Sequence, residues 1–406
     1  MKIIKIIGVF LCAGLLIVVG KISWYLIYSA TSVTCLESRP EDSFGFGKAL
    51  AINDSYIAVG DPKANRVAIY SYDEAEKKWS RTREIYPPKN SIIDRVEHGF
   101  GSSLVFHHNQ LIIGAFSNYV PSNFDENAEN KYISRGFVYS LQLDKNNQNA
   151  LRRINLPEGI NPTGYAVNVF GDRIALKTTV KKDDSKKPDK VLIVNPATLK
   201  VESIIEPPIL LSKRGNFGNG IAGNSEYLVI SAPDIPTNGG VYLVDRQGKI
   251  KTIAISEAFL ADETRKFGAP IAVGDDFLGI YSGGWGGLLS IFKQSSNGWE
   301  EIYSTYFLGS LSAYESQLLV STGRYPFDGG TIHRSPNHLL IDVGEGRAFT
   351  RSTIRWHWWY YGSRPVAYGV IDSKHLLLSR RGKVVLLKKN FLPNYYVIDR
   401  SFCKEK

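Results

Sequence analysis

Short stretches of apolar residues, many of them alternating with polar ones, follow one another along the chain from about residue 44 onwards. Examples are RVAIYSYD from Arg66, GGVYLVDRQG from Gly239 and KVVLLKKN from Lys383. A period of two that is rich in Val, Ile, Tyr and Phe is typical of β-strands. Gly, Asn, Asp and Ser, which favour tight reversals, separate the stretches. The pattern predicts an all-β fold.

One phrase recurs within this pattern, a Phe-Gly pair or a weaker version of it followed by an apolar strand that ends in small residues. FGKALAINDSYIAVGDP and FGNGIAGNSEYLVISAP are clear copies. The seven copies begin at Phe46, Phe100, Thr163, Phe217, Phe267, Leu308 and Val366. Each continues with a loop, a third strand and often a fourth, so the period is roughly 40 to 65 residues, the size of one propeller blade. The sequence therefore predicts a seven-bladed β-propeller over residues 31–406.

Polar turn residues stand between the first and second strands of every copy, as in NDS from Asn53 and DSK from Asp372. Such residues make tight reversals by bonding their side chains to the nearby backbone. The pairs Asp275–Asp276 and His107–His108 fall at this same place in their copies. We therefore interpret both pairs as turn residues and predict no metal site there.

The Phe-Gly pair with the endings GDP, GAF and SAP resembles the FG-GAP repeat, known from the β-propeller of integrin α-subunits. The resemblance is best at Phe46–Gly47, Phe217–Gly218 and Phe267–Gly268, and it covers roughly Phe44 to the C-terminus. Many members of that family carry a calcium loop of the D-x-D-x-D-G kind, in which alternating carboxylates supply the ligands. No copy here contains one, so the chain is similar to extracytoplasmic bacterial proteins with metal-free repeats.

The N-terminal segment, which precedes the repeats, has the composition of a membrane-targeting sequence. Lys2 and Lys5 lead into an unbroken run of apolar or small residues, and the segment Ile6–Tyr28 is 23 residues long. As a helix it would extend about 34 Å, enough to cross a hydrocarbon core of about 30 Å. This predicts a transmembrane signal anchor over residues 1–30. The alternative is a cleaved signal peptide and a secreted protein, and both interpretations place the later residues outside the cytoplasm.

Two of the three cysteines, Cys35 and Cys403, stand at the two ends of the exported part, and Cys12 lies inside the apolar run. Disulfides persist in oxidising compartments. Ring closure brings the ends of a propeller together, so we predict a Cys35–Cys403 disulfide. The alternative is that both are unpaired and behave as small apolar side chains.

Motifs of catalysis are missing from the sequence. It contains no G-x-S-x-G nucleophile elbow, no H-E-x-x-H helix, no Walker loop and no C-x-x-C pair. Its seven histidines are scattered without the spacing of metal ligands. We therefore predict a non-enzyme with no cofactor. The alternative is a carbohydrate-active or quinone-dependent enzyme, which carboxylates converging on the central mouth of the ring would indicate.

Positive charge is concentrated at the C-terminal end. The formal net charge is +10, and 13 Lys or Arg against three acidic residues lie between Arg347 and Lys406. A propeller closes by joining its first and last strands, so this basic end should lie beside the residues that leave the membrane. Lys and Arg near anionic lipid are attracted to it. We expect an anionic membrane surface, and no nucleic acid, to face Arg380, Arg381, Lys388 and Lys389.

The densest aromatic run, RSTIRWHWWYYGSRP, lies inside this basic end. One interpretation is a buried outer strand, because strands favour aromatic residues. The other is an exposed platform on which aromatic rings stack on a partner while arginines hold its anionic groups. Its members would be Arg351, Arg355, Trp356, Trp358, Trp359 and Arg364.

Two long connections, Ser117–Arg135 and Gly323–Asn337, follow the second strands of their copies. Propellers commonly place recognition loops on one rim, although plain solvated insertions are the alternative. Taken with the anchor and the missing catalytic motifs, the sequence predicts a membrane-anchored, extracytoplasmic binding scaffold in the cell envelope. Its partner would be a protein or a glycan.

Overall fold

A computed structural model of the chain describes most of the predicted propeller. The described residues are 33–36, 45–88, 99–119, 133–143, 151–157, 160–179, 189–207, 216–233, 240–253, 266–283, 287–296, 298–306, 309–322, 338–344, 347–357, 367–380, 383–389, 392 and 395–399. The predicted transmembrane anchor at residues 1–30 lies outside them. Within these ranges, no helix is long and apolar enough to cross a membrane.

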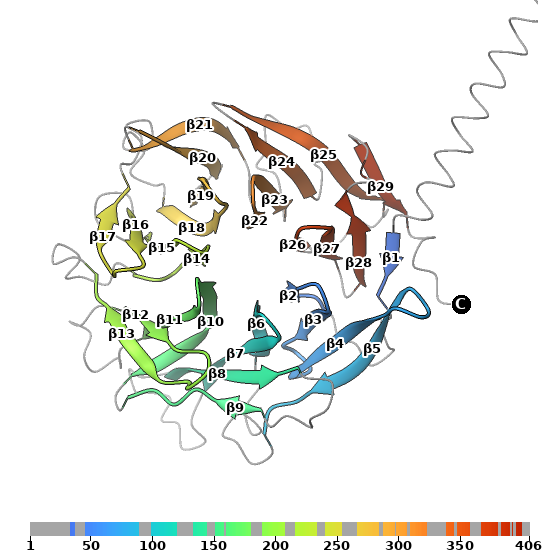
Figure 1. Ribbon diagram of the computed structural model, residues 1–406, viewed down its shortest axis with the longest axis horizontal. Helices are drawn as coiled ribbons and strands as arrows, with labels where there is room; N and C mark the ends of the chain where they lie inside the picture. The colour runs from blue at the N-terminus through green and yellow to red at the C-terminus, as the bar shows by residue number, and fades with distance from the viewer. Residues whose placement is uncertain are drawn as a thin grey trace, which may run out of the picture.

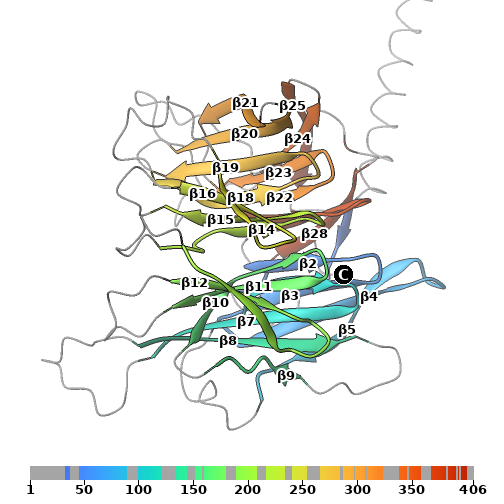
Figure 2. The ribbon, with the colours of Figure 1, turned by 60° about the vertical axis from the view of Figure 1, so that its left-hand side comes forward.

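Seven β-sheets surround a central axis and form a closed ring, as Figure 1 shows. The innermost strand of each sheet contacts the innermost strands of both neighbouring sheets, all the way around the circle. Figure 2 shows neighbouring sheets stacked on one another with a twist between them. The predicted all-β, seven-bladed β-propeller is confirmed.

Six of the blades follow one another along the chain, each with its first strand innermost. Blades 1 to 3 contain β2 (Ala49–Ile52), β3 (Tyr56–Asp61), β4 (Arg66–Asp73) and β5 (Lys78–Ile85); β6 (Gly99–His107), β7 (Gln110–Tyr119), β8 (Ile133–Gln142) and β9 (Arg152–Arg153); and β10 (Asn161–Phe170), β11 (Arg173–Thr179), β12 (Lys190–Val194) and β13 (Val201–Ile205). Blades 4 to 6 contain β14 (Ile221–Gly223), β15 (Tyr227–Ala232), β16 (Gly240–Asp245) and β17 (Ile250–Thr252); β18 (Lys266–Val273), β19 (Phe277–Gly283), β20 (Leu288–Ser295) and β21 (Gly298–Tyr306); and β22 (Gly309–Tyr314), β23 (Gln317–Thr322), β24 (His338–Gly344) and β25 (Arg347–His357).

The seventh blade is completed by strands from both ends of the chain. It contains β26 (Ala367–Ile371), β27 (His375–Arg380) and β28 (Lys383–Lys388), with β1 (Val33–Cys35) as its outer strand. β1 runs antiparallel to β28 and pairs Val33 with Leu387 and Cys35 with Val385. The predicted joining of the first and last strands in one blade is confirmed.

An additional strand, β29 (Tyr395–Asp399), was not expected from the sequence. It returns to blade 6 and pairs in parallel with β25, from Thr353–Tyr395 to His357–Asp399, which makes that sheet five-stranded. The basic C-terminal end is therefore shared between blades 6 and 7 rather than forming one blade.

The hydrophobic core consists of seven clusters, one between each pair of neighbouring blades. The cluster between blades 1 and 2, for example, packs Val67 and Ile69 against Leu111, Ile113 and Tyr139. A single sheet cannot bury both of its faces alone, so each blade depends on its neighbours for its core. Closing the ring provides every blade with two such neighbours.

The recurring Phe-Gly pair makes the joint between consecutive blades. The three described phenylalanine side chains, those of Phe46, Phe100 and Phe217, are at most 2% exposed. The following glycine has a positive φ of 73° to 112° in the copies of blades 1 to 5. A Cβ on Gly47 would lie 2.6 Å from Cβ of Ser379 in the preceding blade, and one on Gly164 would lie 2.1 Å from the carbonyl oxygen of Ala115. The phrase therefore recurs because each copy packs against the blade before it.

The polar residues between the first and second strands make the predicted turns. The side-chain oxygens of Asn53, Asn224 and Asp372 each accept hydrogen bonds from backbone N–H groups two and three residues ahead. This is the local bonding that allows Asx residues to reverse a chain. One predicted connection is shorter than expected, because β7 and β8 extend the pairing to Tyr119 and Ile133.

Candidate functional site

The two ends of the ring differ in the connections that they carry. We call the end with the seven tight turns between first and second strands the turn face. We call the opposite end, with the Phe-Gly joints and the connections between second and third strands, the loop face. The residues of the two long connections, 120–132 and 323–337, lie outside the described part of the chain. They join strands that end at the loop face, after Tyr119 and Thr322.

Hydrogen bonds and ion pairs link neighbouring blades along the turn face. Asn53 Nδ2 donates to the carbonyl oxygen of His108 at 2.7 Å, and Asn224 Nδ2 donates to that of Gly274 at 2.8 Å. The backbone N–H of Asp275 donates to the carbonyl oxygen of Glu315 at 3.0 Å. The same turn residues therefore reverse the chain and hold the next blade, which favours a rigid face.

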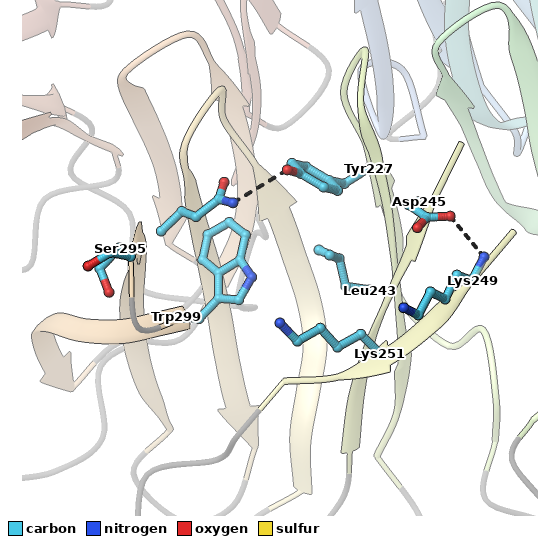
Figure 3. Close-up of a pocket in the computed structure, with 10 residues that line it drawn as sticks. Tyr227, Leu243, Asp245, Lys249, Lys251, Ser295 and Trp299 are labelled. Atoms are coloured by element: carbon cyan, nitrogen blue, oxygen red, sulfur yellow. Dashed lines mark hydrogen bonds between the residues drawn. The ribbon is translucent and has the colours of Figure 1, made fainter. Parts of the chain in front are cut away.

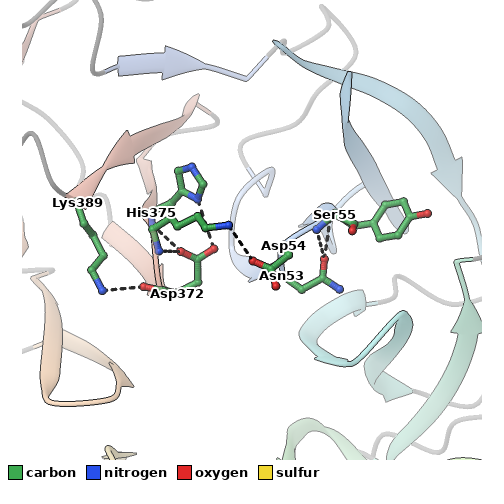
Figure 4. A network of polar contacts seen from close by, with 8 residues as sticks. Asn53, Asp54, Ser55, Asp372, His375 and Lys389 are labelled. Carbon is green, nitrogen blue, oxygen red and sulfur yellow. Dashed lines mark hydrogen bonds and ion pairs between the residues drawn. The ribbon is translucent and has the colours of Figure 1, made fainter. Parts of the chain in front are cut away.

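A polar network at the junction of blades 7 and 1 is centred on Asp372 (Figure 4). Its carboxylate accepts from the backbone N–H of Lys374 at 2.7 Å and lies 3.5 Å from Nδ1 of His375. Burial acts to raise the pKa of Asp372, but hydrogen bonds from the side chain and backbone of His375 and from the backbone of Lys374 outweigh it and hold the pKa below its usual value. Lys374 also reaches Asp54 of blade 1, at 3.6 Å.

Lys389 corrects one prediction, because it is buried and does not face a membrane. Only 6% of the residue is exposed, and Nζ donates to the carbonyl oxygen of Asp372 at 2.9 Å. Nζ also lies 5.4 Å from the ring centroid of Tyr314 in blade 6. Burial lowers the pKa of Lys389, against the opposing attraction of Glu315 and Asp372. This lysine joins blades 6 and 7.

The other three predicted membrane-facing residues do not share one end of blade 7. Arg380 ends β27 and pairs with Lys383 at the loop face, whereas exposed Lys388 pairs with His375 at the turn face. Arg381 lies outside the described residues. A flat surface on either face of the ring would therefore meet only part of the predicted set.

Three of the six residues of the predicted aromatic platform lie on an internal strand of the enlarged sheet of blade 6. The backbone of Arg351, Arg355 and Trp356 belongs to β25, which has β24 on one side and β29 on the other. Arg351 lies 3.8 Å from the carboxylate of Asp342. This part of the run forms a strand, as one interpretation expected, but β29 lies outside it, so β25 is not the outermost strand of the sheet. Trp358, Trp359 and Arg364 lie outside the described residues.

Cys35 is disulfide-bonded. It is the last residue of β1, which runs towards the loop face, and its predicted partner Cys403 lies outside the described residues. β29 runs parallel to β25 and so reaches the loop face at Asp399, four positions before Cys403. The direction of both strands agrees with the predicted pairing, which stays a prediction.

A hollow of about 420 Å³ opens between blades 4 and 5 near the turn face (Figure 3). Its lining residues are Tyr227, Leu243, Asp245, Lys249, Lys251, Gln294, Ser295, Ser296, Gly298 and Trp299. The rings of Tyr227 and Trp299 meet edge to face, with centroids 6.4 Å apart and an interplanar angle of 82°. Gln294 Nε2 donates to the hydroxyl of Tyr227 at 3.4 Å and ties the two blades together.

The sequence did not reveal this hollow, because its walls come from different repeats. Tyr227 begins β15 and Trp299 lies in β21, and neither residue belongs to a recognisable ligand-binding motif. In the sequence, these two residues are distinguished only by their position next to a polar turn. Finding them together required the stacking of blade 5 on blade 4.

The described part of the chain contains few groups of side chains that could form a catalytic or metal site. The seven inner strands contain no aspartate or glutamate along their described lengths. No group of three or more His, Cys, Asp or Glu in the described residues could hold a metal ion. The rings of His107 and His108 do meet, with centroids 4.5 Å apart, and burial followed by the charge of His108 lowers the pKa of His107.

Comparisons with known proteins bear on the fold. No protein-family model matches the chain, and no curated protein matches its sequence. The solved WD40 repeats of RRP9 match with a TM-score of 0.52 at 11% identity, over 89% of this chain and 98% of that one. U3-55K matches at 0.50 and 11%, over 89% and 99%. Streptogramin B lyase matches at 0.49 and 10%, over 89% and 99%. At such low identity, the first two likenesses indicate the β-propeller fold alone.

Proposed function

We propose that this protein is a membrane-tethered, extracytoplasmic β-propeller that acts as a binding scaffold for a protein or glycan partner. The fold is consistent with a protein-interaction scaffold. The observation that carries the proposal is the composition of the inner strands. Carboxylates are the usual acids and bases of glycoside chemistry, and the described inner strands have none. A ring with long connections and no carboxylate along its described inner strands suits binding better than catalysis.

The direction of β1 supports a defined orientation on the membrane. Val33 pairs with Leu387 at the turn face, and the chain then runs towards the loop face. Tyr28, the last residue of the apolar segment, precedes Val33 by five positions, so the two are at most about 18 Å apart along an extended chain. If the segment is an anchor, the turn face lies next to the bilayer. The loop face, from which both long connections start, then points away from it.

The expected anionic membrane surface is proposed to meet a smaller set of residues than the sequence indicated. Lys388 is exposed beside the point where the chain enters blade 7. A lysine near anionic lipid contributes about 1 kcal/mol to attraction. We expect this contribution to adjust the contact of the turn face with lipid, whereas the tether itself supplies most of the attachment.

Membrane fractionation tests the proposal. The full chain is expressed in bacterial cells, and its membranes are washed with alkaline carbonate while intact spheroplasts are treated with protease. We expect the wild-type chain to stay in the washed membranes and to be cleaved from outside. A chain with Leu15→Arg and Leu16→Arg should lose membrane retention, since each arginine costs roughly 3 kcal/mol at the centre of a helix. Extraction of the wild type by carbonate, or its protection from protease, would contradict the proposal.

A further inference from the structure

The hollow between blades 4 and 5 combines a flat apolar wall with polar groups that surround it (Figure 3). Its volume of about 420 Å³ falls in the range of roughly 300 to 1,000 Å³ that small-molecule sites occupy. Tyr227 and Trp299 are partly buried against the core cluster of the two blades. Their rings are therefore held in place before any ligand arrives.

The two lysines of the hollow differ from the lysines of the described chain that form ion pairs. Several lysines have a carboxylate within 4.0 Å, namely Lys78, Lys177, Lys190, Lys293 and Lys374. Lys249 and Lys251 are exposed, and neither side chain has an ion-pair partner among the residues that the structure describes. Lys251 extends towards Trp299 in Figure 3. Two ammonium groups are thus available at one edge of an aromatic wall.

The one carboxylate that lines the hollow is engaged by its own turn. Asp245 Oδ1 accepts hydrogen bonds from the backbone N–H groups of Gln247 at 3.0 Å and of Lys249 at 2.8 Å. These bonds hold the turn in place, and they also reduce the capacity of Asp245 to neutralise the neighbouring lysines. The hollow keeps a net positive charge, which favours an anionic ligand.

The remaining lining groups are amides and hydroxyls. Gln294 contributes a side-chain amide whose nitrogen reaches Tyr227, and Ser296 contributes an exposed hydroxyl on the turn of blade 5. Groups of this kind exchange hydrogen bonds with both donors and acceptors. A ligand that matches them carries several hydroxyls, one anionic group and an apolar face.

We propose that this hollow binds a carboxylated sugar residue of a glycan. The sugar ring lies against the indole of Trp299, and its carboxylate lies between Nζ of Lys249 and Nζ of Lys251. Its hydroxyls exchange hydrogen bonds with Gln294 and Ser296. The inference rests on the proposed binding function and names its ligand class, but it does not depend on membrane attachment. A phosphate group on a lipid fits the two lysines less completely, because it leaves the amide and hydroxyl groups unused.

Calorimetric titration of the full chain in neutral detergent micelles tests the inference. Trigalacturonate is the probe, maltotriose is the neutral control, and glycerol 3-phosphate represents a lipid headgroup. We expect trigalacturonate to bind and maltotriose to bind much more weakly. Lys251→Gln should weaken the binding of trigalacturonate about tenfold, since it removes a hydrogen bond to a charged group. The matched control Lys200→Gln, an exposed lysine on blade 3, should leave it unchanged.

Trp299→Phe should also weaken binding while it keeps an aromatic ring in the core cluster, and circular dichroism checks that the variant is folded. Three outcomes would overturn the inference. They are no binding of trigalacturonate, equal affinity for trigalacturonate and maltotriose, or an unchanged affinity in Lys251→Gln. Tighter, Lys251-dependent binding of glycerol 3-phosphate would assign the hollow to a lipid headgroup instead. If the protein fails the membrane test but binds trigalacturonate, the proposed tether is wrong and the proposed sugar site stands.

Discussion

The glycine of each Phe-Gly pair meets two independent requirements at the joint between blades. Its positive φ is a backbone conformation that costs other residues roughly 1–2 kcal/mol. Its missing side chain also allows the preceding blade to approach, as where Gly164 lies over the backbone of Ala115. Blade 3 retains this glycine although Thr163 has replaced the phenylalanine. The glycine is therefore the more restricted member of the pair.

Alanine substitutions at Gly164 and Gly248 separate the cost of a positive φ from the cost of close packing against the preceding blade. Both glycines have positive φ, 73° and 81°, but a Cβ on Gly248 would meet nothing within 4 Å. Gly248→Ala should reduce the free energy of unfolding by about 1 kcal/mol. Gly164→Ala should reduce it by about 3–5 kcal/mol, since strain and overpacking add. Denaturant unfolding of the two variants checks this, and equal losses would show that close packing at the joint is unimportant.

The lowered pKa of Asp372 predicts that its contribution to the free energy of unfolding decreases as the pH falls. Its folded pKa lies below its unfolded value, which is about 3.9. Its ionised form therefore stabilises the fold above that pH, and the contribution disappears as the pH falls through the folded pKa. Asp372→Asn should cost about 1–2 kcal/mol at pH 7 and less at pH 3, where part of the contribution of the charge is already lost. Unfolding at both pH values measures the difference.

Asp54→Asn is the control for this measurement. The side chain of Asp54 is 78% exposed in its ion pair with Lys374. Such pairs contribute little to stability, so this variant should resemble the wild type at both pH values. A loss in Asp372→Asn that is the same at pH 3 and pH 7 would contradict the assigned role of the charge.

At the scale of elements, the first three strands of each blade were predictable because their signals are local. RVAIYSYD is a short apolar run rich in strand-favouring residues, lies between turns and forms β4 with the predicted bounds. β29 was not predictable, because its pairing with β25 joins residues about forty positions apart in parallel and parallel pairs have no connecting turn to mark them. The burial of Lys389 was missed because its partners, in the turn after β26 and in blade 6, are distant from it along the sequence.

The return of β29 leads to a prediction about the disulfide of Cys35. Peptide mapping by mass spectrometry under non-reducing conditions should find Cys35 joined to Cys403, because both strands run towards the loop face. Reduction should then lower stability by about 2–5 kcal/mol, the usual cost of losing a native disulfide. A Cys12–Cys35 peptide would contradict the pairing and would also argue against a membrane-embedded Cys12.

For the whole molecule, the ring was predictable and the site was not. The count of seven blades follows from copies along the sequence, and closure follows from the need of each blade for two neighbours. The hollow arises only where blade 5 stacks on blade 4, because Trp299 and Tyr227 meet there across the junction. The proposed orientation on the membrane likewise required the direction of β1, which a sequence pattern does not give.

The central claim is that a tethered propeller holds its turn face next to the bilayer, and fluorescence quenching by headgroup-nitroxide lipids tests it most directly. Exposed Ser55 and Lys63 flank β3 at the turn face and the loop face, about 20 Å apart along the strand. Each is replaced by cysteine in a Cys12→Ser chain, labelled with a fluorophore and reconstituted into vesicles. We predict stronger quenching at position 55 than at position 63. Stronger quenching at position 63, or none at either position, would contradict the account.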